Sequence, residues 1–492
     1  MTENLDRRAF LKSAGAAALA VGASGTFAAA AKSPAHPNLV IVFPDQMRGQ
    51  AIGAAGEDPV VTPNLDAFAK ESLYLPHAVS NYPVCSPFRA MLMTGQYPHA
   101  SGVKNNCLSR TTPYNCELPR NARCWSDVLS DKDYSLGYIG KWHLDSPRPP
   151  YVDCKNNRGK DKWNEWCSPD RRHGFDFWYS YGTYDYHLNP MYWAGDTPRM
   201  KPIFVNQWGP EHEADLAIKY ITNVGGKYRK TGKPFALVVS MNPPHTPYSQ
   251  VPEKYKKAYK GKTDRQLINR ANVNLKGKSR GGRIALAHTR NYFAMITGVD
   301  KQFGRIVKAL ADAGLEKNTI VLFTSDHGNC IGSHDQPTKN NHYEESMRIP
   351  FMIRWPGKIR PRKDDLLMST PDIYPTLLDL MGFSKAIPKG LQGASRAGLF
   401  RTGKGDRPKS QLYFWMPIDN PAGGRRGLRN HRYTLEITRQ KNKPEQIILH
   451  DNVNDPYQLI NAAQKLPEVV AKMTAEMNAR LKEINDPWVS DL

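Results

Sequence analysis

A cysteine at the start of a predicted helix is the first residue whose position suggests chemistry. Cys85 stands in the stretch Cys-Ser-Pro-Phe-Arg with Pro87 and Arg89, and Gly95 can end the helix. Proline suits the first turn of a helix, where free backbone N–H groups favour an anion. Cys85 is therefore predicted to be a nucleophile or a site of modification. The alternative is a cysteine that is simply buried beside the helix end.

Polar residues follow several predicted strands at the point where each strand ends. Apolar, β-branched runs at 38–43, 233–241 and 319–324 predict buried parallel strands. The polar residues that follow these runs are Asp45, Gln46, His245, Asp326 and His327. Because open α/β sheets bind ligands at the carboxyl ends of their strands, we expect these side chains to line one site.

A lysine and a histidine lie two residues apart in the stretch Gly-Lys-Trp-His-Leu. Lys141 and His143 follow a predicted strand that begins near Tyr134. On an extended segment, residues two apart point to the same face, so a cation and an imidazole would be aimed at one oxyanion. Alone, such a pair is typical of solvated surface, but its position among the other segments favours a site.

These segments together resemble the type I sulfatases, the formylglycine-dependent enzymes of the alkaline phosphatase superfamily. The resemblance lies in Cys-x-Pro-x-Arg at 85–89, Gly-Lys-Trp-His-Leu at 140–144, Ser-Asp-His-Gly at 325–328 and Tyr-Glu-x-Ser-x-Arg-x-Pro at 343–350. Thr-Pro-Asn-Leu-Asp at 62–66 and Pro-His-x-Pro at 244–247 agree with it. The resemblance is strong over residues 37–382 and weaker over 411–460.

A metal site is implied by this resemblance. Its ligands would be Asp45, Gln46, the modified Cys85, Asp326 and His327. Ca²⁺ is the expected ion, and it accepts amide oxygens such as that of Gln46. His327 is a softer ligand than the Asn that can occupy its place in the family, so Mn²⁺ or Zn²⁺ stays an alternative.

The resemblance also implies roles for the other residues. A maturation enzyme would oxidise Cys85 to formylglycine, whose hydrated aldehyde attacks sulfur. The expected partners in the reaction are Lys141 and Lys339 as sulfate-binding cations, Arg89 as the residue that orients position 85, His245 as the acid for the leaving alcohol, and His143 as the base that lets sulfate leave.

Charge and aromatic content indicate the substrate class. The net charge is +22, which favours a polyanionic partner. Residues 145–213 are rich in aromatic and basic side chains, and the candidate sugar-binding residues there are Arg171, Tyr184, His187 and Trp193. A sulfated carbohydrate is therefore the expected substrate, and no nucleic-acid partner is expected. The sequence does not indicate which sugar, which sulfate position, or exo or endo action.

Two other functions fit parts of the pattern. One is a phosphonate or phosphodiester hydrolase of the same superfamily, although Lys141, His143 and His245 in sulfatase positions argue against it. The other is an inactive sulfated-glycan-binding protein, for which Gln46 and His327 are the support.

The N-terminal segment predicts export. Arg7-Arg8-Ala-Phe-Leu-Lys precedes an Ala-rich apolar run that ends at Ala31, which resembles a signal peptide of the twin-arginine type over residues 1–31. The alternative is an N-terminal membrane anchor. We expect a bacterial periplasmic or secreted protein without stable membrane insertion after cleavage. Six cysteines besides Cys85 permit disulfides there, but the sequence does not choose their pairing.

The elements that position these residues predict an α/β fold. We expect a large mixed, mostly parallel sheet sandwiched by helices over residues 36–385, and a smaller C-terminal α+β subdomain, an antiparallel sheet plus helix, over 400–492. Strands are predicted at 412–415, 433–437 and 446–450, and a final helix at 467–484. The basic segment 255–283 is expected to be an exposed loop or lid, followed by a long helix over 292–310.

Overall fold

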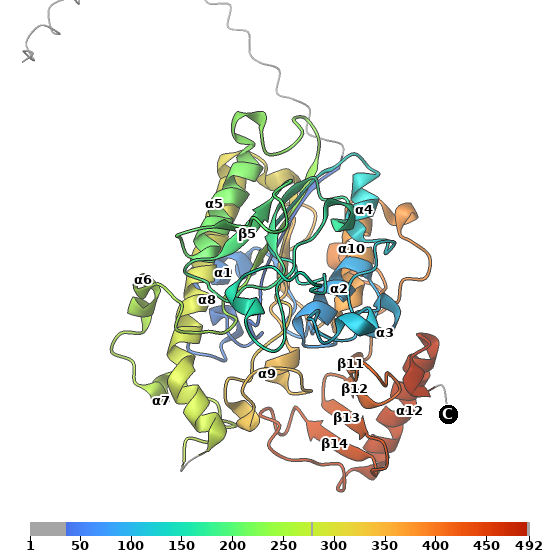
Figure 1. Cartoon of the computed structure of the whole chain (residues 1–492). Helices are drawn as coiled ribbons and strands as arrows, with labels where there is room; N and C mark the ends of the chain where they lie inside the picture. Colours follow the sequence, from blue (N-terminus) through green and yellow to red (C-terminus); the bar gives the residue numbers. More distant parts are fainter. Residues whose placement is uncertain (1–35, 277–278, 490–492) are drawn as a thin grey trace, which may run out of the picture. The chain divides into compact units, whose positions relative to one another are not determined.

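The computed structural model describes residues 36–276 and 279–489, so the predicted signal segment lies outside the described residues. A ten-stranded sheet forms the centre of this part (Figure 1). In spatial order its strands are β10 (Arg362–Lys363), β2 (Leu73–Tyr74), β9 (Met352–Arg354), β8 (Thr319–Phe323), β1 (Asn38–Pro44), β7 (Phe235–Met241), β3 (Ser135–Lys141), β4 (Phe177–Tyr181), β5 (Met191–Ala194) and β6 (Ile203–Phe204).

The middle of this sheet is parallel. Strands β8, β1, β7, β3 and β4 pair in parallel, whereas β9 and β5 join them antiparallel at either side. Parallel strands buried on both faces read as continuous apolar runs, which is why these strands could be predicted. Their carboxyl ends meet at one edge of the sheet, where the predicted polar residues lie.

Successive residues of each central strand contribute to opposite faces of the sheet. In β1, Leu39 and Ile41 pack into one core and Val40 and Val42 into the other. The first core is completed by α2 (Cys85–Thr94), α4 (Trp125–Ser130), α10 (Ile373–Leu380) and α11 (Ala397–Thr402), and the second by α1 (Pro63–Lys70), α5 (Gly209–Thr222) and α8 (Arg280–Asp312). Short helices α3 (Pro98–Ser101), α6 (Glu253–Lys256), α7 (Asp264–Leu267) and α9 (Glu344–Met347) lie in the connections.

A second sheet follows near the C-terminus. It is antiparallel, in the order β11 (Gln411–Trp415), β12 (Gly424–Arg429), β13 (Tyr433–Arg439) and β14 (Gln446–Asp451). Helix α12 (Pro467–Glu483) packs on this sheet through Met473, Met477 and Leu481. The predicted fold class is thus confirmed. Strand β12 escaped prediction because Gly-Arg-Arg-Gly-Leu-Arg lacks the usual apolar pattern.

The basic segment differs from the prediction. Helix α8 begins at Arg280 rather than near Tyr292, and the Ser279 side chain caps it by accepting a hydrogen bond from the Gly282 N–H. The residues before it are not simply an exposed loop. Tyr259 and Leu267 are buried in the core that α1, α5 and α8 form with one face of the sheet. Long basic side chains on the solvent face hid this packing in the sequence. Among the described helices, none combines the length and apolarity needed to cross a bilayer.

Gly140, in the last part of β3, is predicted to be intolerant of any side chain. Its φ is +96°, and a Cβ there would lie 2.1 Å from the Ser240 carbonyl oxygen of the neighbouring strand. We expect Gly140→Ala to lower the free energy of unfolding by about 2–4 kcal/mol, measured by urea denaturation. Gly398 in α11 has open space around it, so Gly398→Ala is the matched control and should cost nothing. Equal free energies of unfolding for the two variants would show that position 140 tolerates a side chain.

Candidate functional site

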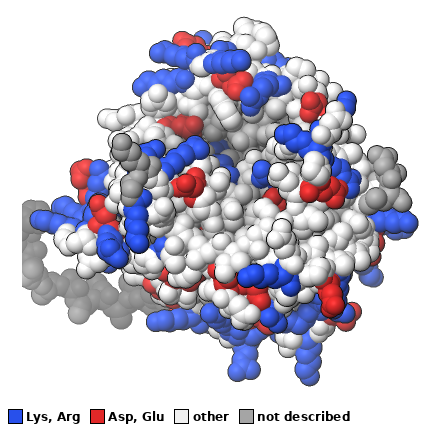
Figure 2. Space-filling model, turned by 90° about the horizontal axis from the view of Figure 1, so that it is seen from below, with Lys and Arg blue, Asp and Glu red and all other residues white. Residues whose placement is uncertain are grey.

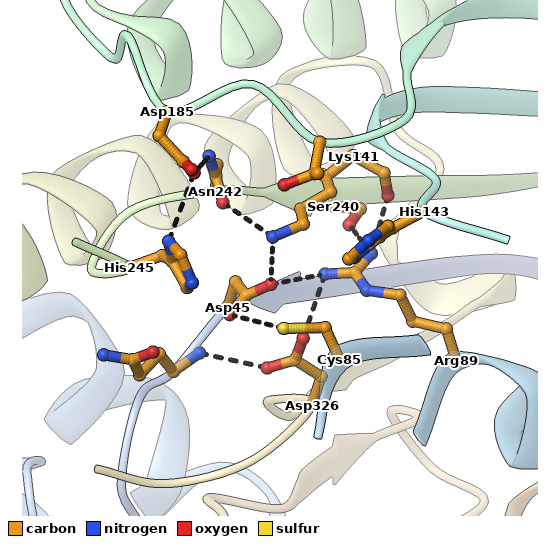
Figure 3. Close-up of polar contacts among 12 residues, drawn as sticks. Asp45, Cys85, Arg89, Lys141, His143, Asp185, Ser240, Asn242, His245 and Asp326 are labelled. Carbon is orange, nitrogen blue, oxygen red and sulfur yellow. Dashed lines mark hydrogen bonds and ion pairs between the residues drawn. The ribbon is translucent and has the colours of Figure 1, made fainter. Parts of the chain in front are cut away.

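The predicted polar residues meet at the carboxyl edge of the parallel strands, beside the first turn of α2 (Figure 3). Cys85 is the first residue of that helix and is buried. Its Sγ lies 3.3 Å from His327 Nε2, 3.6 Å from Asp45 Oδ1 and 3.6 Å from Lys339 Nζ. Three residues that lie far from Cys85 in the sequence thus surround its sulfur atom.

The Cys85 thiol is not activated as a thiolate. Burial, and then the nearby Asp45 carboxylate, raise its pKa to about 12. These effects outweigh the two lysines, which favour the charged form. An unmodified cysteine here would therefore be protonated at neutral pH. Burial at this position therefore argues against a thiolate nucleophile.

Two buried carboxylates, those of Asp45 and Asp326, lie close to this sulfur and share one guanidinium. Arg89 donates from Nη2 to Asp45 Oδ2 at 3.1 Å and to Asp326 Oδ2 at 3.0 Å. Its Nη1 donates to the Lys141 carbonyl and to Ser240 Oγ, at 2.6 and 2.7 Å. Arg89 thus links α2 to β3 and β7 as well as to the two acids, and its position is fixed by the fold.

The two carboxylates differ in their protonation. Burial alone would raise the pKa of Asp45, but Lys141, His245 and His327 together hold it well below the usual range. Burial and the neighbouring Asp45 raise the pKa of Asp326 to about 7. Ionising both of two facing carboxylates has a high free-energy cost unless further positive charge compensates them.

The remaining atoms of this cluster suit a divalent cation. His327 donates from Nδ1 to the Gly328 carbonyl at 2.9 Å, which leaves the Nε2 lone pair 3.4 Å from Asp45 Oδ1 and 3.5 Å from Asp326 Oδ1. One ligand atom each of Asp45, Cys85, Asp326 and His327 lies within 4.8 Å of the others. Oxygen ligands with one imidazole fit a hard or borderline cation.

Gln46 presents its side-chain oxygen to the same cluster. Its Oε1 accepts a hydrogen bond from Lys339 Nζ at 2.7 Å, while its amide nitrogen donates to Tyr248 Oη at 2.8 Å. Because a lysine ammonium can only donate, Lys339 requires the oxygen end of the amide to face it. Gln46 and Lys339 therefore lie where the sequence predicts them, next to residue 85.

Lys141 and His143 reach the site by a different backbone path than predicted. Lys141 ends β3 and forms an ion pair with Asp45 Oδ2 at 2.8 Å. His143 has a φ of +52°, so the segment is not extended and simple alternation does not place its ring. His143 Nε2 donates to the Cys107 carbonyl at 3.2 Å, whereas Nδ1 is buried without a hydrogen-bond partner among the described residues. Burial and two nearby cations, Lys141 and Arg89, lower its pKa, so the ring is neutral.

His245 has an acidic partner that the sequence does not reveal. Asp185 Oδ1 lies 3.2 Å from His245 Nδ1 and accepts a hydrogen bond from Asn242 Nδ2 at 3.2 Å. Burial alone would raise the pKa of Asp185, but His245 and Lys141 lower it below the usual range. Asp185 lies in a loop without periodicity, so no sequence pattern marks it.

The four candidate sugar-binding residues are placed differently. His187 lies beside the site, because its Nε2 is 2.9 Å from the His245 carbonyl oxygen. Trp193 packs in a small core with Tyr184 and is only 1% exposed, which leaves no free ring face for a sugar. Arg171 forms ion pairs with Asp145 and Glu117 and lines a charged cavity of about 490 Å³.

A second group of possible metal ligands is explained by local structure. Cys124, Asp127 and His173 lie close together. Asp127 Oδ2 accepts a hydrogen bond from the Cys124 N–H at 2.8 Å, as in a helix capping box, and lies 3.2 Å from His173 Nδ1. This cluster caps α4.

Comparison with known proteins agrees with this geometry. The family model described as "Sulfatase" matches residues 37–383, and that of the N-sulphoglucosamine sulphohydrolase C-terminal region matches 332–486. The chain is 42% identical to an endo-4-O-sulfatase of Bacteroides thetaiotaomicron, with 94% of this chain and 95% of the relative covered. It is 34% identical to an ulvan-active sulfatase of Formosa agariphila, with 93% and 83% covered. The solved structure of a Bacteroides fragilis protein proposed to be a sulfatase is 50% identical, with a TM-score of 0.89 and coverage of 92% and 97%.

Proposed function

The chain belongs to the sulfatase family, and on that premise we propose that it hydrolyses 4-O-sulfate esters within a sulfated polysaccharide. The observation that carries the sulfatase chemistry is the set of contacts around Cys85, with two lysines, three histidines and two aspartates at the carboxyl edge of the sheet. The 42% identical endo-4-O-sulfatase and the ulvan-active relative support a polymeric, sulfated substrate.

The charge of the protein suits such a polymer. The net charge is +22, and Figure 2 shows more Lys and Arg than Asp and Glu side chains on the face seen from below. A positive surface raises the local concentration of a polyanion and speeds its association. We further propose that residues 1–31 direct twin-arginine export, so that the enzyme meets its substrate in the periplasm or outside the cell.

Two groups that the chain must acquire complete the proposed site. A maturation enzyme would convert Cys85 to formylglycine, which supplies a nucleophilic oxygen in place of the unreactive thiol. A divalent cation, with Ca²⁺ expected, would be held by Asp45, Gln46, Asp326 and His327 and supplies positive charge next to the sulfate.

The chain's own residues bind the sulfate and move protons. Lys141 and Lys339 flank residue 85 and bind sulfate oxygens as point charges. His245 Nδ1 donates to the Thr246 carbonyl at 2.9 Å and faces Asp185, so an acid role requires a second proton, on Nε2, which would pass to the leaving alcohol. Burial, Lys339 and Lys141 lower the pKa of His245, and Asp185 is one of the groups that oppose this by stabilising the protonated ring. His143 presents a free Nδ1, and this neutral nitrogen can accept the proton that must leave residue 85 before sulfate departs.

Asp185 is predicted to act through His245. In Asp185→Asn the amide cannot stabilise a protonated imidazole, so we expect kcat to fall about 10- to 100-fold with KM changed less than threefold. Initial rates of sulfate release measure both constants. Asp153→Asn is the matched control, because that carboxylate is 87% exposed. Equal kcat values for the two variants would show that Asp185 does not support proton donation by His245.

The proposed function is tested by sulfate release from defined glycans. The substrates are a glycosaminoglycan polymer bearing 4-O-sulfate, its 6-O-sulfated isomer and the 4-O-sulfated disaccharide. We expect the matured enzyme to prefer the 4-O-sulfated polymer over both, and Cys85→Ala to release no sulfate. Release from the disaccharide alone would contradict endo action. Turnover of a phosphodiester or phosphonate ester, without any sulfate release, would favour the other hydrolase class of the superfamily.

A further inference from the structure

The loop that carries Lys339 is joined to the C-terminal sheet by a buried pair of histidines. His342 lies three residues after Lys339, and His450 lies on β14. Their Nε2 atoms are 3.2 Å apart, and the two side chains are almost completely buried, at 3% and 4% exposure. This contact therefore connects a residue of the active site with a different part of the fold.

The partners of the two rings determine where their protons lie. His342 Nδ1 faces Glu436 Oε2 at 2.7 Å, and His450 Nδ1 faces the Ile460 carbonyl oxygen at 2.9 Å. Both partners are acceptors, so both Nδ1 atoms carry hydrogen. If both rings were neutral, two Nε2 lone pairs would face each other inside the protein. Such a buried contact is unfavourable unless a positive charge lies between the nitrogens.

We infer that one extra proton is held between His342 Nε2 and His450 Nε2, and that this proton-linked pair positions Lys339. Glu436 faces the His342 ring directly and therefore balances this positive charge. Burial and the facing His342 lower the pKa of His450 to about 4, so His450 is the neutral acceptor. Glu436, His342 and His450 then form a neutral, fully hydrogen-bonded chain.

Other charged or titratable groups surround this chain from several elements. Arg425 on β12 lies 3.8 Å from Glu436 Oε1. The Tyr343 ring stacks on His334 and contacts the His342 ring at a tilt. The remaining groups that face the pair or its neighbours are Tyr413 on β11, Glu345, which pairs with His334, and Asp455 after β14. Arg425 also stabilises the ionised form of Glu436, so the carboxylate that balances the proton stays charged.

Side chains from the C-terminal part of the chain also hold the backbone on either side of His342. The Asn340 carbonyl accepts a hydrogen bond from Arg425 Nη1 at 3.5 Å, and the Glu344 N–H donates to Gln458 Oε1 at 2.9 Å. The loop between these points is thus held by the C-terminal part of the chain on both sides of His342. Its other end places Lys339 Nζ 2.7 Å from Gln46 Oε1. This inference rests on the proposed function, in which Lys339 binds sulfate.

The inference predicts an alkaline limit to sulfate binding. The proton is present at low pH and is lost as the pH rises, after which the two lone pairs face each other and the loop loosens. Glu436→Gln removes the balancing charge, so the proton is lost at lower pH and the alkaline rise in KM moves to lower pH. In His450→Gln the amide N–H can donate to a neutral His342, so activity is kept and this alkaline limit disappears.

A double-mutant cycle tests whether the pair acts through Lys339. We expect His450→Phe to lower kcat/KM about tenfold in the natural chain and to have no further effect in Lys339→Ala. His431→Phe, in the turn between β12 and β13 of the same sheet, is the control. Calorimetric titration with sulfate gives the same comparison without turnover, so it reports on the pair even if the proposed activity is absent.

Three results would overturn the inference. Equal losses from His450→Phe with and without Lys339 would show that the pair has only a general structural role. An unchanged alkaline limit in Glu436→Gln would show that no balanced proton is present. A zinc ion found in the natural chain and absent from His450→Phe would place a metal, and not a proton, between the two nitrogens.

Discussion

Two aspartate carboxylates that face each other inside the protein impose the constraint on which the site depends. Asp45 and Asp326 are completely buried at the ends of neighbouring parallel strands. Desolvation and mutual repulsion oppose their ionisation, and a single guanidinium, that of Arg89, bonds to both. Further positive charge is therefore needed close by, and Lys141 and Lys339 supply part of it. The divalent cation of the proposed function would supply more, and together these charges would let an anionic sulfate approach the two acids.

The fold supplies this charge by bringing the ends of several strands together. Strand β3 delivers Lys141, the loop after β7 delivers His245, and α2 begins at Cys85. Arg89 is held by the Lys141 carbonyl and Ser240 Oγ, so the residue that balances the acids also ties the helix to the strands. Lys339 differs from the others, because the C-terminal sheet helps to hold its loop.

The sequence predicted most of this site because buried parallel strands have a strong apolar signal and each ends in an identifiable polar motif. Asp45, Cys85, Asp326 and Lys339 lie together as the motifs indicate. The predictions failed where tertiary packing overrides local pattern. Strand β12 has arginines at interior positions, and Arg426 is buried there because Asp486 balances it. No local signal could place His143 in a left-handed conformation.

Asp185 and the histidine pair show a second limit of sequence reasoning. Each depends on a partner far along the chain, His245 for Asp185 and His450 for His342. Hydrogen bonds across such separations leave no periodicity, and a histidine or aspartate in a polar loop resembles solvated surface. Trp193 shows the reverse error, because an aromatic residue in a polar segment suggested a sugar platform and is a core residue instead.

The central claim is that the paired carboxylates form a divalent-cation site next to residue 85. The most direct test is metal analysis of the purified protein, followed by calorimetric titration of the chelated protein with Ca²⁺. The account predicts one cation per chain, and an affinity at least about tenfold lower in Asp326→Asn but unchanged in Asp153→Asn. Full sulfate release by a protein that binds no divalent cation would contradict it.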